Sequence, residues 1–180
     1  MPIYLIRHGQ SEFNAVARDG IDPLIYDAPL TELGRAQADA TRAQVKDLGI
    51  EQVICSPLTR AVQTALRIFE GTTPISVEAH HREMVCNSCD VGRHPEILAL
   101  EFPTLQFDHL EPHWWHLGPE NEHGVPHEPV EIFHERVRTF APILEASTTR
   151  PLAIVGHGLF FEAMLGRMLN NCEIAQYSPE

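Results

Sequence analysis

Short apolar segments alternate with helical patterns along this chain of 180 residues, and this alternation most constrains its fold. The segments at 2–6, 51–55, 75–79 and 151–155 are mostly apolar and too short for helices, so we expect each to form a strand. Strands that alternate with helices predict a mostly parallel sheet covered on both faces. We therefore predict an α/β fold, a three-layer α/β/α sandwich.

The first two long helices have recognisable starts. Thr31 is a suitable N-cap for a helix that ends at Leu48-Gly49. The apolar face of this helix is predicted from residues at helical spacing, namely Leu33, Ala36, Ala40 and Ala43. Ser56-Pro57 predicts the cap and first position of the next helix. That helix has the clearest apolar periodicity in the chain, at Leu58, Ala61, Val62, Ala65, Leu66 and Phe69.

The second half of the chain contains a long segment without periodicity. Residues 103–129 hold five prolines, five histidines and two tryptophans, and they follow a short helix predicted at 95–102. A loop of this length in a compact domain is usually functional, and we predict a lid or substrate loop. A helix from Pro129 with a kink at Pro142, a helix over 159–169 and an edge strand within 172–177 complete the prediction. We expect residues 1–180 to form a single domain.

Charge and composition narrow the class of partner. The formal charge of −12 argues against nucleic acid and anionic membranes, since both require a basic surface. Lys46 is the sole lysine, and the arginines that supply the other cations suit phosphate or carboxylate recognition. The chain shows no leader segment and no run of about 18 apolar residues, so we expect a cytoplasmic protein. In that setting free thiols are expected at Cys55, Cys86, Cys89 and Cys172.

Charged and imidazole side chains follow each predicted parallel strand. The carboxyl ends of parallel strands lie along one edge of a sheet, where open α/β folds bind ligands. We therefore expect these side chains to converge, and they are Arg7, His8, Arg60, Arg82, Glu83 and His157.

This set of residue types suits phosphoryl transfer. Arginines such as Arg7 and Arg60 supply delocalised positive charge in a fork that fits a phosphate dianion. One neutral imidazole can attack phosphorus, and a second, charged imidazole can stabilise the transition state. A carboxyl group can protonate the leaving oxygen and later activate water. The helix start at Ser56-Pro57 is expected to add positive partial charge, and no metal or other cofactor is required.

The motifs together carry a resemblance to a known family. They are Arg7-His8-Gly9, Asn14, the Leu30 to Ala38 helix segment, Ser56-Pro57-Leu58-Thr59-Arg60-Ala61, Arg82-Glu83 and Gly156-His157-Gly158. In these residues the chain resembles the histidine phosphatase superfamily, which has the phosphoglycerate mutase-like fold. The resemblance implies a phosphohistidine at His8 and Glu83 as the proton donor. It also implies a phosphate pocket of Arg7, Asn14, Arg60, His157 and the backbone near Leu159.

The sequence departs from the family pattern directly after Glu83. Many members have a glycine and then an acidic-glycine pair there, whereas residues 84–92 read Met-Val-Cys-Asn-Ser-Cys-Asp-Val-Gly. Asp90 and Glu78 are therefore alternative proton donors. The chain also lacks the insertions expected of glycolytic mutases, which favours a phosphatase over a mutase.

We predict a metal-independent phosphatase that hydrolyses a phosphate monoester, a small molecule or a phosphoprotein. A phosphomutase using the same site is the first alternative. A catalytically inactive module that binds a phosphorylated ligand is the second, although the intact His8 and His157 argue against it. The substrate and the oligomeric state are left open by the sequence.

Several residues have both a functional and a structural interpretation. Cys86 and Cys89, or the histidines of the 103–129 loop, could bind a metal, but free thiols and solvated histidines are the expectation. Trp114-Trp115 is expected to anchor the loop to the core and not to stack on a ligand. Arg93 is expected either to bind a second anionic group of the substrate or to form a surface ion pair.

Overall fold

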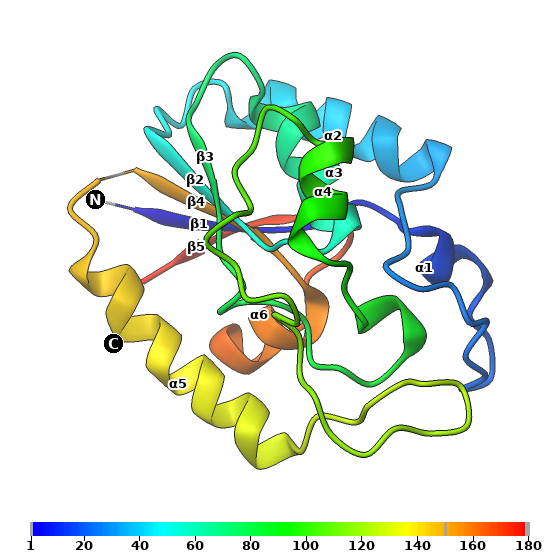
Figure 1. The fold of residues 1–180 in the computed structure, drawn as a ribbon. Coiled ribbons are helices and arrows are strands. Elements are labelled where there is room, and N and C mark those ends of the chain that lie inside the picture. The colour runs from blue at the N-terminus through cyan, green and yellow to red at the C-terminus, as the bar shows by residue number, and fades with distance from the viewer. Residues whose placement is uncertain (1, 150, 179–180) are drawn as a thin grey trace.

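The computed structural model describes residues 2–149 and 151–178 and contains a five-stranded sheet between two layers of helices (Figure 1). The strand order is β3-β2-β4-β1-β5, in which β5 pairs antiparallel with β1 and the other pairs are parallel. The predicted α/β sandwich and the C-terminal edge strand are therefore confirmed. The strands are β1 (Ile3–Arg7), β2 (Gln52–Cys55), β3 (Ile75–Val77), β4 (Leu152–Gly156) and β5 (Ile174–Tyr177).

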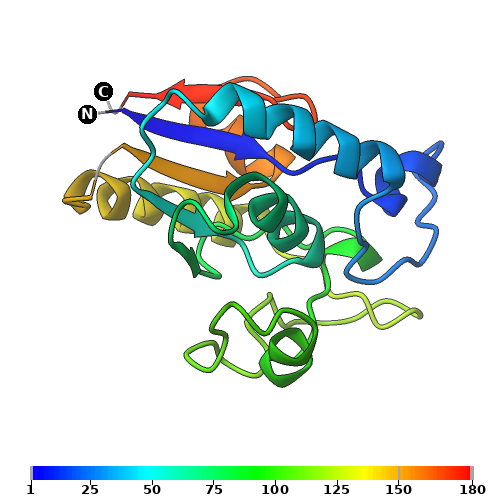
Figure 2. The ribbon, with the colours of Figure 1, turned by 90° about the horizontal axis from the view of Figure 1, so that it is seen from above.

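The long helices cover the two faces of the sheet (Figures 1 and 2). One layer contains α2 (Glu32–Val45) and α3 (Thr59–Phe69), and the other contains α5 (Val130–Ala146) and α6 (Gly158–Leu165). Shorter elements are α1 (Glu12–Val16), the 3-10 turn η1 (Ser88–Asp90) and α4 (Pro95–Glu101). No helix in the described parts of the chain is both long enough and apolar enough to cross a membrane.

Alternation along the strands creates a separate core on each face. In β1, Ile3 and Leu5 belong to the core under α5 and α6, whereas Ile6 belongs to the core under α2 and α3. Successive side chains of a strand point to opposite faces, so each strand contributes to both cores. In β4 all five residues are buried, as expected for a central strand of a parallel sheet.

The predicted buried face of α2 is wrong. Thr31 does cap the helix, since its hydroxyl accepts the N–H of Gly34 at 3.0 Å. The buried residues are nevertheless Gly34, Ala38, Thr41 and Val45, and Leu33 is 53% exposed. A Cβ atom at Gly34 would lie 2.1 Å from the carbonyl oxygen of Gln10. This close backbone approach sets the face of the helix, and apolar spacing alone does not reveal it.

Two further helix boundaries differ from the prediction. α3 begins at Thr59, with Leu58 as its cap, instead of at Pro57 with Ser56 as the cap. The backbone N–H of Thr59 donates to the buried carboxylate of Asp27 at 2.8 Å. The positive end of this helix therefore faces Asp27. α6 ends at Leu165, earlier than the predicted 169, because Gly166 adopts the left-handed conformation with φ 69°.

Within 103–129 the structure has neither a helix nor a strand. Phe107 and Trp114 are nevertheless buried in the core under α2 and α3, and the Trp114 indole N–H donates to the carbonyl oxygen of Arg93 at 2.9 Å. The prediction that Trp114 anchors this loop is confirmed. The role of the loop as a lid remains a prediction.

Candidate active site

His8 follows β1 directly and is held as a neutral imidazole. Its ring is buried, with Nδ1 2.7 Å from the carbonyl oxygen of Gly9 and Nε2 3.2 Å from Nε of Arg60. Since a guanidinium nitrogen donates and a carbonyl oxygen accepts, the proton lies on Nδ1 and the lone pair on Nε2. Burial, and then the charges of Arg60 and Arg7, lower the pKa of His8 well below its usual value. The unprotonated Nε2 is a suitable nucleophile.

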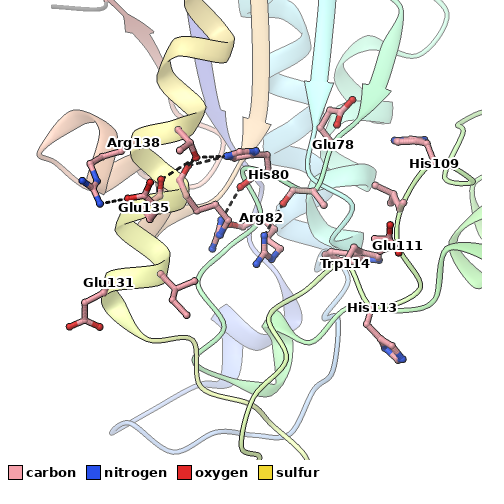
Figure 3. Close-up of a pocket in the computed structure, with 15 residues that line it drawn as sticks. Glu78, His80, Arg82, His109, Glu111, His113, Trp114, Glu131, Glu135 and Arg138 are labelled. Carbon is pink, nitrogen blue, oxygen red and sulfur yellow. Dashed lines mark hydrogen bonds and ion pairs between the residues drawn. The ribbon is translucent and has the colours of Figure 1, made fainter.

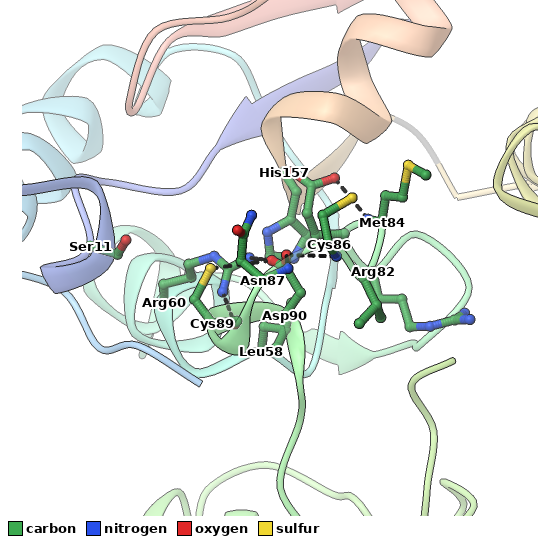
Figure 4. Close-up of polar contacts among 12 residues, drawn as sticks. Ser11, Leu58, Arg60, Arg82, Met84, Cys86, Asn87, Cys89, Asp90 and His157 are labelled. Atoms are coloured by element: carbon green, nitrogen blue, oxygen red, sulfur yellow. Dashed lines mark hydrogen bonds and ion pairs between the residues drawn. The ribbon is translucent and has the colours of Figure 1, made fainter. Parts of the chain in front are cut away.

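Arg60 lies in the first turn of α3, and each donor group of its guanidinium has a partner. Besides the contact to His8, its terminal nitrogens donate to the carbonyl oxygen of Cys89 at 2.5 Å and to Asp90 at 2.9 Å. The other carboxylate oxygen of Asp90 accepts the backbone N–H groups of Cys86 and Asn87. Figure 4 shows Asp90 between Arg60 and this turn. Asp90 therefore fixes the guanidinium beside His8.

His157 follows β4 and lies beside His8, with 5.3 Å between the ring centroids. Its Nε2 is 2.7 Å from the hydroxyl oxygen of Ser56, which the sequence analysis treats as a helix cap. Its Nδ1 is buried and has no partner among the described residues. Burial, followed by the charge of Arg60, lowers the pKa of His157 well below its usual value. Without a bound anion, this lowered pKa favours the neutral imidazole. A charged ring in the transition state stays a prediction.

Glu83 places its carboxylate at the N-terminus of α6. One oxygen accepts the N–H of Leu159 at 3.0 Å, and the other accepts the N–H of Phe160 at 3.2 Å. The side chain is only 8% exposed. Burial, and then the charge of Asp90, raise the pKa of Glu83 to about 7. At neutral pH the group is therefore divided between its acid and its base form.

The two alternative proton donors lie in less suitable places. Both carboxylate oxygens of Asp90 are engaged by Arg60 and by backbone N–H groups. Glu78 is exposed and lines a cleft of about 910 Å³ between α5 and the 103–129 loop (Figure 3). Arg82 lines the same cleft and points away from His157 (Figure 4). Glu83 differs from Asp90 in having only backbone N–H partners and no ion pair, and burial raises its pKa to about 7.

Arg7, at the end of β1, carries an incompletely paired guanidinium. One terminal nitrogen donates to the carbonyl oxygen of Leu169 at 2.5 Å, while its buried Nε has no partner among the described residues. The guanidinium packs on Gly158, where a Cβ atom would lie 3.3 Å from it. Burial lowers the pKa of Arg7. An unpaired buried donor is costly, and a bound oxyanion would satisfy it.

Asn14 and Arg93 have structural partners. Asn14 is exposed, and its side-chain oxygen closes a capping box with Ser11 at the start of α1. A role in phosphate binding stays a prediction for this residue. Arg93 pairs with Asp27 at 2.7 Å and with Glu101 at 2.6 Å, so it forms the ion pair that was one of its two expected roles.

The proposed metal-binding side chains are dispersed. In residues 2–149 and 151–178, no three His, Cys, Asp or Glu side chains are grouped closely enough to hold a metal ion. Cys86 and Cys89 are free thiols, and burial raises the pKa of Cys86 to about 11. Such thiols are poor ligands at neutral pH, because the thiolate is the binding form.

A buried ion pair near the site is absent from the sequence predictions. Glu128 is fully buried and pairs with Arg136, whose guanidinium contacts the backbone at Glu83. The sequence offers one sign of this pair: Arg136 lies on the apolar face of α5, among Phe133, Val137 and Phe140. The pairing itself depends on the tertiary fold.

Comparison with known proteins identifies the family. An adenosylcobalamin/alpha-ribazole phosphatase of Salmonella typhimurium is 27% identical over 171 residues, which cover 94% of this chain and 80% of the relative. Phosphoglycerate mutase-like protein 1 of Arabidopsis thaliana is 28% identical over an alignment of 208 residues, which covers 94% of this chain and 72% of the relative. The crystal structure of the alpha-ribazole phosphatase from Shigella flexneri superposes with a TM-score of 0.66 at 22% identity. The superposition covers 98% of this chain and 89% of the Shigella chain. The family model of the histidine phosphatase superfamily (branch 1) matches residues 3–178, and the chain therefore belongs to this superfamily.

Proposed function

We propose that this protein is a phosphatase that hydrolyses a phosphate monoester through a phosphohistidine on His8. The observation that carries the proposal is the neutral His8 imidazole, whose unprotonated Nε2 accepts the N–H of Arg60 at 3.2 Å. Bound phosphate would take this N–H and free the Nε2 lone pair for attack. Attack by this atom on phosphorus would form a P–N bond and break the ester P–O bond. Phosphatases among the relatives support the same class of reaction.

Glu83 acts as acid and then as base in this scheme. Its protonated form would donate a proton to the leaving alkoxide as the ester bond breaks. The resulting carboxylate would take a proton from a water molecule as that water attacks phosphorus. This attack would break the P–N bond and release inorganic phosphate. A pKa of about 7 suits both steps, because each form is populated at neutral pH.

The phosphate group would bind among buried nitrogen atoms that lack other partners. The Nε of Arg7 and the Nδ1 of His157 are both buried and unpaired within the described residues. The N–H of Leu159, the expected backbone ligand, donates to Glu83 in this structure. Substrate phosphate would therefore replace the Glu83 carboxylate at the α6 N-terminus. The displaced carboxyl group would then be free to approach the leaving oxygen.

A phosphomutase is the second candidate, and the similarity to a phosphoglycerate mutase-like protein favours it. In that case a hydroxyl group of the bound product, in place of water, would attack the phosphohistidine. The catalytically inactive module is a third possibility, which any turnover excludes.

A panel of phosphate monoesters tests the proposed function. We expect release of inorganic phosphate from alkyl and aryl esters, unchanged by EDTA, because Arg7 and Arg60 supply the positive charge that a metal would otherwise bring. Phosphate release should be measured with and without chelator after dialysis. Transfer between hydroxyl groups without release would indicate the mutase. Loss of activity with EDTA and recovery with zinc would contradict the metal-free mechanism.

The substitution Arg60→Lys is expected to lower kcat/KM by about 10²-fold or more, although the charge is kept. A lysine ammonium has no fork that can contact His8, Cys89 and Asp90 together. Arg67→Lys on the same helix is the matched control, because Arg67 forms an exposed pair with Asp39 at 3.2 Å. Equal, small effects of the two substitutions would refute the role of Arg60.

A further inference from the structure

We propose that the buried pair Glu128–Arg136 is a positioning element for Glu83, fixing the backbone from which its carboxyl group moves between the α6 N-terminus and the leaving oxygen. The inference rests on the proposed function, since it assigns these residues a part in proton transfer. Neither residue is close to Glu83 in sequence. Glu128 ends the 103–129 loop, and Arg136 lies in α5.

The pair is buried and bidentate. Glu128 is fully buried and Arg136 is 9% exposed. One terminal nitrogen of Arg136 lies 2.8 Å from one carboxylate oxygen of Glu128, and its Nε lies 3.1 Å from the other. This geometry leaves one terminal nitrogen free for other acceptors and aligns the guanidinium plane.

Arg136 uses its remaining donors on the backbone that carries Glu83. Its Nη1 donates to the carbonyl oxygens of His80 at 3.0 Å and Arg82 at 2.7 Å. Its Nη2, which also binds Glu128, donates to the carbonyl oxygen of Glu83 at 3.4 Å. Glu128 holds the other side, because its carboxylate accepts the N–H of Val85 at 3.2 Å and its own N–H donates to the Val85 carbonyl oxygen at 2.9 Å. The segment 80–85 is therefore fixed both before and after Glu83.

The same guanidinium also contacts the helix that receives the Glu83 carboxylate. It lies 5.4 Å from the ring centroid of Phe160, whose backbone N–H donates to Glu83 at 3.2 Å. Arg136 thus lies over the side chain of the residue that donates this hydrogen bond and contacts the backbone of the residue that accepts it. A shift of the guanidinium would move Glu83 relative to α6.

Stability alone gives a weak reason for a buried ion pair. Burying two charges costs about as much as their attraction returns, and apolar replacements are often neutral or stabilising. The apolar neighbours Phe133, Val137 and Phe140 would accommodate a hydrocarbon side chain at position 136. A hydrocarbon side chain at position 136 would, however, lose the hydrogen bonds to segment 80–85.

The test compares leaving groups in Arg136→Lys and Glu128→Gln. A misplaced catalytic group can cost about 10²-fold, so we expect kcat on an alkyl phosphate to fall by about 10- to 100-fold. The burst of p-nitrophenolate from p-nitrophenyl phosphate should stay within about twofold, because this leaving group needs little protonation. KM for the alkyl ester should stay unchanged, since the phosphate ligands are untouched.

Arg138→Lys is the matched control, because Arg138 lies on the same helix and pairs with Glu135 at the surface (Figure 3). We expect this variant to behave as the wild type. Equal losses on both substrates, a change in KM alone, or failure of both variants to fold would overturn the inference and leave the pair a purely structural role. Absence of hydrolysis by the wild type would instead refute the proposed function itself.

Discussion

The substitution His8→Ala is expected to abolish turnover, with kcat falling by about 10⁴-fold or more. The reason is that no other group described in the structure combines an unprotonated nitrogen with direct contact to Arg60. Without Nε2, the phosphoryl group has no covalent acceptor, and direct attack by water is much slower. The measurement is steady-state hydrolysis of p-nitrophenyl phosphate, accompanied by thermal unfolding to verify the fold.

His123→Ala is a suitable control, since His123 is an exposed residue of the 103–129 loop. It should retain full activity. Near-normal turnover by His8→Ala would refute the assignment of the nucleophile, and an equal loss in both variants would point to instability.

Glu83→Gln is expected to slow hydrolysis of an alkyl phosphate by about 10²- to 10⁴-fold, the usual range for general acid catalysis. An alkoxide is a poor leaving group without a proton, whereas p-nitrophenolate departs readily. The burst of p-nitrophenolate should therefore be retained. Later turnover should be slow, because the glutamine cannot act as the base that activates water for hydrolysis of the phosphohistidine. Rapid-mixing kinetics with both substrates separates the two steps.

The pH dependence gives a second readout for Glu83. Its pKa is raised to about 7, so the acid form is depleted as the pH rises above that value. In the wild type, the rate at which an alkyl ester phosphorylates His8 should thus decline above about pH 7. Glu83→Gln should show no such decline in its pH–rate profile. Glu78→Gln, an exposed control, should keep the decline. If Glu83→Gln slows both leaving groups equally in the burst, Asp90 becomes the residue to test.

Much of the fold follows from local sequence patterns. Parallel strands are buried on both sides, so β1 and β4 are visible as apolar runs, and helices with a wide apolar face, such as α3, are equally clear. The apolar spacing of α2 predicts the wrong buried face, because Gly34 and Ala38 face the core and the larger Leu33 is exposed. A backbone contact between Gly34 and Gln10 decides this, and no periodicity encodes it.

The sequence predicts which residue types meet at one edge of the sheet, but not the contacts among them. His8, Arg60, Glu83 and His157 lie near their predicted places because each follows a strand. Their hydrogen-bond partners are long-range: Ser56 contacts His157, and Asp90 contacts Arg60 from a turn 30 residues away. The Glu128–Arg136 pair is wholly tertiary. Such partners carry no local signature, which is why the sequence leaves them out.

Trapping the phosphoenzyme tests the central claim most directly. The enzyme should be mixed with an ester carrying radiolabelled phosphate, quenched with alkaline denaturant within one turnover, and digested for peptide mapping. The account predicts a base-stable, acid-labile label on the peptide that contains His8, and no label in His8→Ala. An acid-stable label on another residue, or turnover with a burst and no covalent label, would contradict it.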